Sequence, residues 1–338
     1  MNLKQNKYSQ YALVKEMMDT IDVVKKFDSK QTEAIAQKIS LAKKLLLTGE
    51  GSSRIFPAKN AIRKALTLGL ELCITTDGSR QSALYDLSNF AVFCASNSGK
   101  TKEIILLAKK LAAIGNDNRF ALSANKNTPL ENECNETFIL NCGWEQAVAA
   151  TKSVIEQALF YESILWNIGN ITDPIKTSGL SEKIEKVLTM PIDPKIIEVA
   201  INAPTIYFAG YNDGVAEELT LKTNEITRKK SDFLEGTYAV HGIEEVMKKE
   251  DIVFVIDPIE EEIEKFQTVL VDGVGLTVVA ISTKDTPFPT VIIPDAGEMN
   301  SHVFLSAGWN LLVEIGIALG IDLDKPERAR KVGNEFLG

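Results

Sequence analysis

The sequence predicts two tandem α/β domains, each with a parallel β-sheet covered by helices. Three observations support this fold class: apolar strand-like runs without polar alternation, helical segments between them, and a second half that repeats the plan of the first. Strands that are apolar on both sides must be buried on both faces, which is typical of parallel sheets in α/β domains.

The first half of the chain supplies four of the expected strands. Residues 8–44 carry apolar residues at helical spacing, with a break near residue 28 and Ser29 as the expected N-cap of the second helix. A strand that runs into a Gly/Ser loop is expected over residues 45–53. Further strands are expected over 70–75, 90–95 and 120–123, with helices over 55–68 and 102–114.

The second half repeats the landmarks of the first at nearly constant spacing. Gly49 and Gly210, each at the end of an apolar run, are 161 positions apart, and so are Ser96 and Asp257. A third pair of similar segments, at 122–123 and 281–282, is 159 positions apart. Because the spacing persists across three landmarks, we infer two copies of one unit.

The repeat divides the chain into four expected segments. These are N-terminal helices over 1–44, a first domain with the ligand site over 45–170, a connector over 171–204 with one helix near 181–188, and a second domain with a C-terminal tail over 205–338. In the second domain His302 begins an apolar helix over 303–319, and we expect this histidine to be structural.

Composition and charge exclude several classes of function. Hydrophobic residues make up 45% of the 338 residues and charged residues 25%, and the net charge is −9. This acidic balance speaks against nucleic acid as a partner, since phosphate backbones are bound by clustered Lys and Arg. No stretch reaches the roughly 20 uncharged apolar residues of a membrane span, and no apolar segment of a signal peptide follows the N-terminus. We therefore expect a cytoplasmic protein without a membrane partner.

Cysteine and histidine are too few and too scattered for a predicted metal site. The four cysteines, Cys73, Cys94, Cys134 and Cys142, form no CxxC pair, and the chain has two histidines. Cys73 and Cys94 each lie in an apolar run, where we expect buried thiols. We expect no metal, no disulfide framework and no organic cofactor.

Two polar loops follow strands of the first half. Ligands of open parallel sheets bind at the carboxyl ends of strands, near the point where strand order reverses. The loop 96–101 (SNSGKT) offers hydroxyl groups, a glycine and the N–H groups of the next helix, which suit a phosphate, and Ser52 and Ser53 could complete the site. The alternative is an ordinary strand-to-helix turn with Ser as N-cap.

These loops lack the nucleotide-binding patterns. The chain has no G-x-x-x-x-G-K-[ST] run, and Arg54 stands where G-x-G-x-x-G requires its third glycine. The equivalent segment of the second half, 257–262 (DPIEEE), is acidic and would repel phosphate. The sequence therefore predicts one phosphate site per chain.

Six motifs occur in a fixed order along residues 45–335. They are Gly51-Ser52-Ser53, the loop 96–101, Val148-Ala149-Ala150-Thr151-Lys152, the helix carrying Glu218, Lys222 and Glu225, His241-Gly242, and Asp322-Leu323-Asp324-Lys325-Pro326 with Lys331. In this order they resemble the motifs of the double-SIS phosphosugar isomerase family, which includes the isomerase half of glucosamine-6-phosphate synthase. The resemblance implies SIS-type, flavodoxin-like three-layer domains. It also implies an enzyme that interconverts aldose and ketose forms of a sugar or amino-sugar 6-phosphate.

The resemblance also implies roles for individual residues. Glu225 would be the base that moves a proton between sugar C1 and C2, and His241 would help to open the ring in the site of a neighbouring subunit. Lys331 would lie near the oxygen that becomes anionic, with Lys222 nearby. The phosphate would be held by Ser52, Ser96, Ser98 and Thr101, and the other phosphate- or sugar-binding positions are Gly51, Ser53, Asn97, Val148, Ala150 and Lys152. A homodimer with shared active sites would follow.

The residues of the predicted helix suit this chemistry. Exchange through an enediol needs a base near C1 and C2 and an electrophile for the oxygen. Glu218, Lys222 and Glu225 share one face of a helix, which places a cation between two carboxylates. The alternative is a solvated helix face with ordinary ion pairs. His241 and Lys331 could likewise be a structural histidine and a solvent-facing lysine of the tail.

The sequence leaves the reaction open. An amino-sugar-phosphate deaminase or a fructosamine-6-phosphate deglycase would pass through similar intermediates with similar residues. Ile243 follows His-Gly where the family has Pro, Tyr238 stands where several members have an acid, and the tail 332–334 departs from the usual ending. No glutaminase domain precedes residue 45, so we expect no ammonia channelling. A non-catalytic regulator that senses a sugar phosphate is the other alternative, although the N-terminal helices are not markedly basic.

Overall fold

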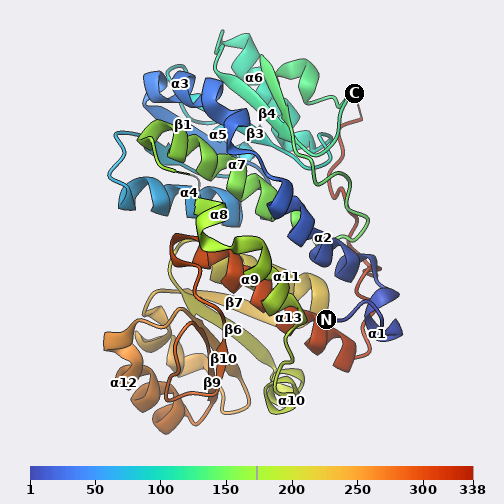
Figure 1. Ribbon diagram of the computed structural model, residues 1–338, viewed down its shortest axis with the longest axis vertical. Coiled ribbons are helices and arrows are strands. Elements are labelled where there is room, and N and C mark those ends of the chain that lie inside the picture. The colour runs from blue at the N-terminus through green and yellow to red at the C-terminus, as the bar shows by residue number, and fades with distance from the viewer. Residues whose placement is uncertain (173, 338) are drawn as a thin grey trace. The chain divides into compact units, whose positions relative to one another are not determined.

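In the computed structural model, which describes residues 1–172 and 174–337, the strands form two parallel sheets (Figure 1). Sheet 1 has the order β2-β1-β3-β4-β5 and sheet 2 the order β10-β9-β8-β6-β7. Counted from its other edge, sheet 2 repeats sheet 1, with β6 in the place of β1 and β8 in the place of β3. All strand pairs are parallel, so the predicted fold class is confirmed. The strands of sheet 1 are β1 (Lys44–Thr48), β2 (Cys73–Thr75), β3 (Ala91–Ala95), β4 (Arg119–Ser123) and β5 (Glu136–Ile139); those of sheet 2 are β6 (Thr205–Gly210), β7 (Lys230–Glu235), β8 (Ile252–Ile256), β9 (Thr277–Ser282) and β10 (Thr290–Ile292).

The central strands of sheet 1 are apolar on both sides because helices cover both faces. Val92 and Cys94 of β3 share a buried cluster with α6 (Lys102–Ala113). Phe93, between them, points the other way, and its ring lies 5.7 Å from that of Phe160 on α7 (Lys152–Gly169). Since successive strand side chains alternate between faces, this packing explains the continuous apolar run. The other helices beside this sheet are α3 (Glu33–Ala42), α4 (Ile55–Thr67) and α5 (Ser79–Ser82).

Sheet 2 is built in the same way. Tyr207, Val253 and Val255 belong to a buried cluster that includes Phe266 of α12 (Ile263–Phe266) and Leu270 of the following π-helix (Gln267–Val274). Helices α11 (Val215–Thr227) and α13 (Asn300–Ala318) lie in the same compact unit as sheet 2 and pack against each other. The remaining helices are α1 (Asn6–Ser9), α2 (Ala12–Lys26), α8 (Pro174–Ser178), α9 (Leu180–Thr189) and α10 (Pro194–Asn202).

The chain forms two compact units, each built on one sheet. The sheet-1 unit contains Asp22–Gln146, Ala150–Asp173 and Arg328–Gly338, and the sheet-2 unit contains Met1–Ile21, Ala147–Ala149 and Pro174–Glu327. The units thus follow contacts rather than order along the chain, and the C-terminal tail belongs to the sheet-1 unit. The predicted domain boundaries at 44, 170 and 204 stay predictions, and residues 173 and 338 of those segments lie outside the described residues.

Several predicted details were wrong. The expected connector contains three helices, α8, α9 and α10, instead of one, because each of them buries apolar residues within the sheet-2 unit. Strand β5 was not predicted, since it is a half-buried edge strand that includes Glu136 and Thr137. Cys73 is exposed rather than buried, because β2 is a short strand at the other edge of the sheet. Asp28, rather than Ser29, supplies the side-chain cap, which accepts a hydrogen bond from the Lys30 amide.

One segment has the length and composition of a membrane-spanning helix. Gly297–Ala318, which includes α13, meets both criteria, but 83% of its apolar window is buried inside the protein. His302 lies in this helix and is fully buried. An apolar surface on all sides is expected of the central helix of a packed unit.

Candidate active site

The two polar loops of the first half lie at the switch point of sheet 1. Strand β1 pairs with β2 on one side and with β3 on the other, so the chain changes direction across the sheet between β1 and β3. The segment 49–54 follows β1 and the loop 96–101 follows β3, both at the carboxyl edge. Crevices at this position are where parallel α/β sheets bind ligands.

The loop 96–101 gathers three hydroxyl groups between β3 and α6. Ser96 Oγ lies 2.8 Å from Thr101 Oγ1 and 3.4 Å from Ser98 Oγ. Ser96 and Ser98 are buried, and their Oγ atoms accept hydrogen bonds from the amides of Gly99 and Lys100. Thr101 is the N-cap residue of α6, but its side chain makes no capping bond to the helix. The hydroxyl groups therefore shape a tight turn at a helix N-terminus, where the N–H groups and the helix dipole favour an anion.

Gly99 is required by the geometry of this loop. Its φ is +64°, and a Cβ at this position would stand 2.4 Å from the side chain of Thr128. We expect Gly99→Ala to lower the free energy of unfolding by about 2–4 kcal/mol through backbone strain and overpacking. Gly69→Ala is the matched control, since Gly69 has a φ of +63° with nothing within 4 Å of the added Cβ. Urea unfolding of both variants measures the difference, and equal losses would contradict a role for the Thr128 contact.

The loop after β1 contributes a second turn. Gly51 has a φ of +54°, and Gly51–Ser53 form a 3₁₀ turn in which Ser52 is buried. The carbonyl of Ser53 accepts a hydrogen bond of 2.7 Å from Gln157 Nε2 on α7. The turn is thus fixed to the helix that begins at Lys152.

The segment between β5 and α7 holds the other predicted ligand-binding positions of the first half. Val148 and Ala150 are half-buried in this segment, and Lys152 is a buried residue at the start of α7. Glu145, a residue that the sequence analysis did not single out, is fully buried here and contacts Asn97 of the loop 96–101 at 2.9 Å. The only signal for Glu145 was its position three residues before the Val-Ala-Ala-Thr-Lys motif.

The C-terminal tail runs beside the loop 96–101 within the sheet-1 unit. The Lys102 amide donates to the Asn334 carbonyl at 3.0 Å, and the Phe336 amide donates to the Lys100 carbonyl at 2.9 Å. Lys331 Nζ lies 3.8 Å from Glu145 Oε2, and the lysine side chain is 17% exposed. The tail therefore carries Lys331 to Glu145, which also contacts Asn97, and the predicted role of Lys331 stays a prediction.

Of the three predicted residues on α11, Lys222 and Glu218 are buried rather than solvated, and Glu225 is partly exposed. Lys222 Nζ lies 2.7 Å from Glu225 Oε2 and 3.3 Å from Glu218 Oε1, and Lys222 and Glu218 are fully buried. Burial lowers the pKa of Lys222, but the two carboxylates, Glu225 foremost, outweigh burial and hold this pKa above its ordinary value. Lys222 is therefore a cation at neutral pH. The Glu225 side chain is 27% exposed, so Glu225 is the one of the two acids that solutes can reach.

His241 lies apart from this ion pair. It follows a 3₁₀ turn, Tyr238–Val240, after β7, and Gly242 behind it has a φ of +109°. The ring is exposed, and its Nε2 lies 3.5 Å from Lys265 Nζ. Within the described residues His241 hydrogen-bonds to neither Lys222 nor Glu225. An exposed ring on a loop remains available to another molecule.

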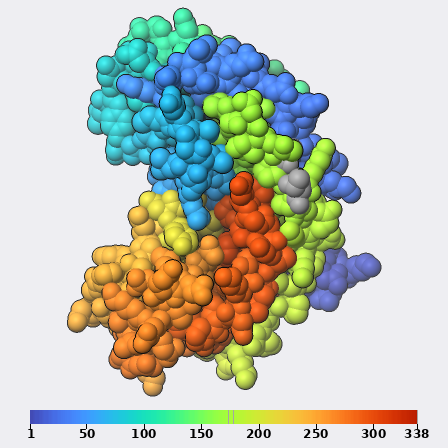
Figure 2. All heavy atoms as spheres, turned by 60° about the vertical axis from the view of Figure 1, so that its left-hand side comes forward, coloured from blue at the N-terminus to red at the C-terminus, as the bar shows by residue number. Residues whose placement is uncertain are grey.

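The second sheet has no equivalent of the hydroxyl loop. The segment 257–262 follows β8 at the position that loop 96–101 has after β3, and it leads into a 3₁₀ turn of Glu260–Glu262. Glu260 and Glu261 are exposed, and the part of the chain around residues 260–280 is drawn in orange on the face of the molecule that Figure 2 shows. Carboxylates at this position would repel phosphate, and one phosphate site per chain stays a prediction.

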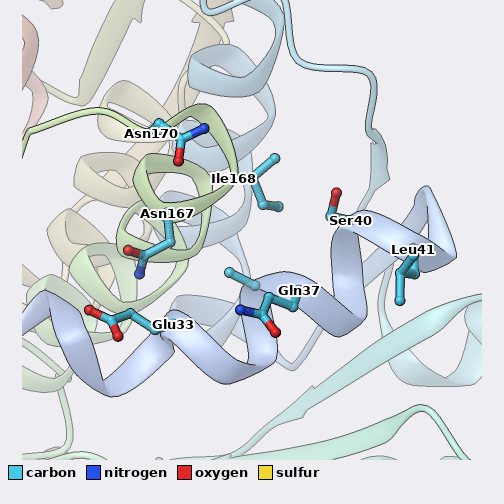
Figure 3. A pocket seen from close by; sticks show the side chains of 8 residues that line it. Glu33, Gln37, Ser40, Leu41, Asn167, Ile168 and Asn170 are labelled. Carbon is cyan, nitrogen blue, oxygen red and sulfur yellow. The ribbon is translucent and has the colours of Figure 1, made fainter.

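A separate hollow in the sheet-1 unit contains none of the predicted site residues. Figure 3 shows this hollow, of about 570 Å³, between α3 and the end of α7. Its lining has amide groups, a hydroxyl and one carboxylate, Glu33, but no Lys or Arg. In the described residues, no group of three or more His, Cys, Asp or Glu side chains is placed to hold a metal ion.

Comparison with known proteins gives matches in structure only. No protein-family model matches the chain. No curated protein matches it in sequence. Among solved structures it is similar to tagatose-6-phosphate ketose/aldose isomerase from Escherichia coli, with 15% identity and a TM-score of 0.75 over 96% of this chain and 99% of that one. It is similar to glucosamine-6-phosphate deaminase from Thermotoga maritima, with 20% identity and a TM-score of 0.73 over 95% and 99%.

A third similar structure is the C-terminal domain of glucosamine-fructose-6-phosphate aminotransferase from Francisella tularensis. The identity is 17% and the TM-score 0.75, over 95% of this chain and 100% of that one. The chain has the tandem SIS fold. The predicted resemblance is thereby confirmed for the fold. At these identities it is the residues themselves that must support a function.

Proposed function

We propose that this tandem SIS protein is an enzyme that acts on the carbonyl end of a sugar or amino-sugar 6-phosphate. The reaction is aldose–ketose isomerisation through an enediol. The observation that carries the proposal is the loop 96–101, which gathers three hydroxyl groups at a helix N-terminus on the switch point of sheet 1. The fold adds support, since the proteins that share it include a ketose/aldose isomerase and a deaminase whose names specify sugar 6-phosphates.

In this proposal the phosphate is anchored by Ser52, Ser96, Ser98 and Thr101. Glu225 removes the proton from the carbon next to the carbonyl group and returns it to the former carbonyl carbon. A proton also moves from the hydroxyl oxygen on the first of these carbons to the former carbonyl oxygen, so both protons move in the same direction and the sugar is neither oxidised nor reduced overall. Lys222 Nζ, 2.7 Å from Glu225 Oε2, holds the Glu225 carboxylate in position. Lys331 stabilises the oxygen that becomes anionic, and His241 opens the ring, in a homodimer with shared sites.

Amine release from an amino-sugar 6-phosphate or a fructosamine 6-phosphate starts with the same proton removal. The proposal therefore extends to deaminase and deglycase reactions, and the substrate panel described next distinguishes them from isomerisation.

A substrate panel tests the proposal. Fructose 6-phosphate, glucosamine 6-phosphate and a fructosamine 6-phosphate are incubated with the protein, each beside its unphosphorylated form. Product formation by NMR and ammonia release are followed. We expect turnover of one phosphorylated sugar and at least about a 100-fold lower kcat/KM without the phosphate, because binding of a remote group contributes to catalysis. Tight binding of a sugar phosphate without turnover would instead show a sensor of this ligand. No binding and no turnover would refute the proposed function.

A further inference from the structure

Glu145 is a buried carboxylate that the proposed mechanism does not use. Its side chain is fully buried in the segment between β5 and α7. Oε1 accepts hydrogen bonds from the amide of Thr151 at 2.7 Å and from Thr151 Oγ1 at 3.1 Å. Oε2 accepts from Ser153 Oγ at 2.5 Å and from Asn97 Nδ2 at 2.9 Å. A buried charge is tolerated only where such donors compensate it, so Glu145 holds these groups firmly in place.

The partners of Glu145 come from three segments that carry predicted ligand-binding residues. Asn97 lies in the phosphate loop, 48 positions away along the sequence. Thr151 directly precedes Lys152 at the start of α7, and Lys331 Nζ of the tail lies 3.8 Å from Glu145 Oε2. All of these residues belong to the sheet-1 unit. One carboxylate thus connects the loop, the helix start and the tail.

The Glu145 carboxylate also fixes the orientation of the Asn97 side-chain amide. A carboxylate only accepts hydrogen bonds, so the NH₂ group of Asn97 must face it. The same Nδ2 also contacts Ser153 Oγ at 3.1 Å, which uses both of its hydrogens. Asn97 Oδ1 is left buried, with no hydrogen-bond partner among the described residues. A buried acceptor without a donor is costly, and a ligand can supply the donor.

We propose that Glu145 is a positioning residue that turns the Asn97 amide so that its Oδ1 accepts a hydrogen bond from a hydroxyl group of the bound sugar. This inference rests on the proposed function. It changes the chemistry expected of Asn97, since its NH₂ group is committed to Glu145 and Ser153 and does not serve a phosphate oxygen. Specificity for the sugar is then separate from affinity for the phosphate, which the hydroxyl groups of Ser96, Ser98 and Thr101 provide.

Glu145→Gln tests this separation. The Thr151 amide is a backbone donor to Oε1, so the introduced Gln side chain would keep its oxygen toward Thr151 and present its NH₂ group to Asn97. The two facing donors would force the Asn97 amide to turn over. Calorimetric titration compares inorganic phosphate with fructose 6-phosphate as probes. In the variant we expect the affinity for fructose 6-phosphate to fall about tenfold, the effect of one misplaced buried hydrogen bond. The affinity for inorganic phosphate should stay within about twofold, since its donors are unchanged.

Glu156→Gln is the matched control. Glu156 is also buried, on α7, and it accepts from the backbone amides of Asn141 and Cys142 at 2.8 and 2.6 Å. Its replacement should leave both affinities unchanged. If Glu145→Gln does not fold, Ser153→Ala takes its place, because it removes the second acceptor of the Asn97 amide and should weaken only fructose 6-phosphate, by a smaller factor.

The outcomes distinguish the two proposals. If the wild-type protein binds fructose 6-phosphate no better than inorganic phosphate, and turns over no sugar phosphate, the proposed function fails. If the wild type prefers fructose 6-phosphate but Glu145→Gln keeps this preference, the positioning role of Glu145 is refuted. An equal fall in the affinities for inorganic phosphate and fructose 6-phosphate in Glu145→Gln would also refute the positioning role, because such a fall would show general damage to the loop.

Discussion

Lys222→Met is expected to lower the free energy of unfolding by about 3–5 kcal/mol. The lysine is fully buried between Glu218 and Glu225, and Glu218 is buried just as completely. Met has a similar shape but no charge, so Glu218 would lose its cation in a place that water does not reach. Urea unfolding followed by circular dichroism measures the loss. Lys195→Met, an exposed change on α10, should cost less than about 0.5 kcal/mol.

The pair of Glu218 and Lys222 allows a stricter control. The double variant Glu218→Met/Lys222→Met removes the cation together with its buried carboxylate, and we expect it to recover most of the lost stability. A double variant that is less stable than the single variant would contradict this account.

The same ion pairs predict how the stability of the wild-type protein depends on pH. The pKa of Lys222 is raised in the folded protein above its ordinary value of 10.5. Its stabilising contribution is therefore fully present below that value, and it is lost only as the pH rises through the folded pKa. The titration of this lysine should leave stability at neutral pH unaffected.

Patterns of short range made the fold and part of the site predictable. Apolar runs such as 90–95 reflect burial on both faces of a strand, and the loop 96–101 follows directly from its strand, so the carboxyl edge of sheet 1 could be located. Glu218, Lys222 and Glu225 were singled out by the resemblance of their spacing to a motif of the double-SIS family, and helix geometry added that residues three and four positions apart share one face. That this face is buried could not be predicted, since it depends on packing within the sheet-2 unit.

Contacts between distant segments were the part that the sequence did not reveal. Glu145 is a single acid in a loop, and its partners Asn97 and Lys331 lie far away in the sequence. No periodicity connects such residues. Asp324 is a similar case: its carboxylate accepts hydrogen bonds from the amides of Ala12 and Leu13 and so caps α2 from the other end of the chain. Residues that organise a site through long-range hydrogen bonds need a structure to be found.

Glu225→Gln is expected to lower kcat of the proposed isomerase reaction by about 10²- to 10⁴-fold, the range for loss of a general base. Gln has the size of Glu, and its carbonyl oxygen can still accept the hydrogen bond that Lys222 Nζ donates to Glu225 at 2.7 Å. Folding and binding of the sugar phosphate should therefore persist, so KM and the thermal midpoint should change little. The measurement is a set of initial rates on the substrate identified by the panel, together with thermal unfolding.

Comparing the changes in kcat, KM, proton exchange and stability of Glu225→Gln shows whether Glu225 is the catalytic base or only a structural partner of Lys222. Glu198→Gln, at an exposed position on α10, controls for the removal of one negative charge and should keep the wild-type rate. If Glu225 is the base, the fall appears in kcat, and exchange of the C1 and C2 protons with solvent stops as well, since no group removes the proton. If Glu225→Gln kept this exchange, another residue would carry the proton, and the assignment of Glu225 would be wrong. A change in KM or stability alone would mean that the ion pair with Lys222 is structural, because transition-state stabilisation acts on kcat.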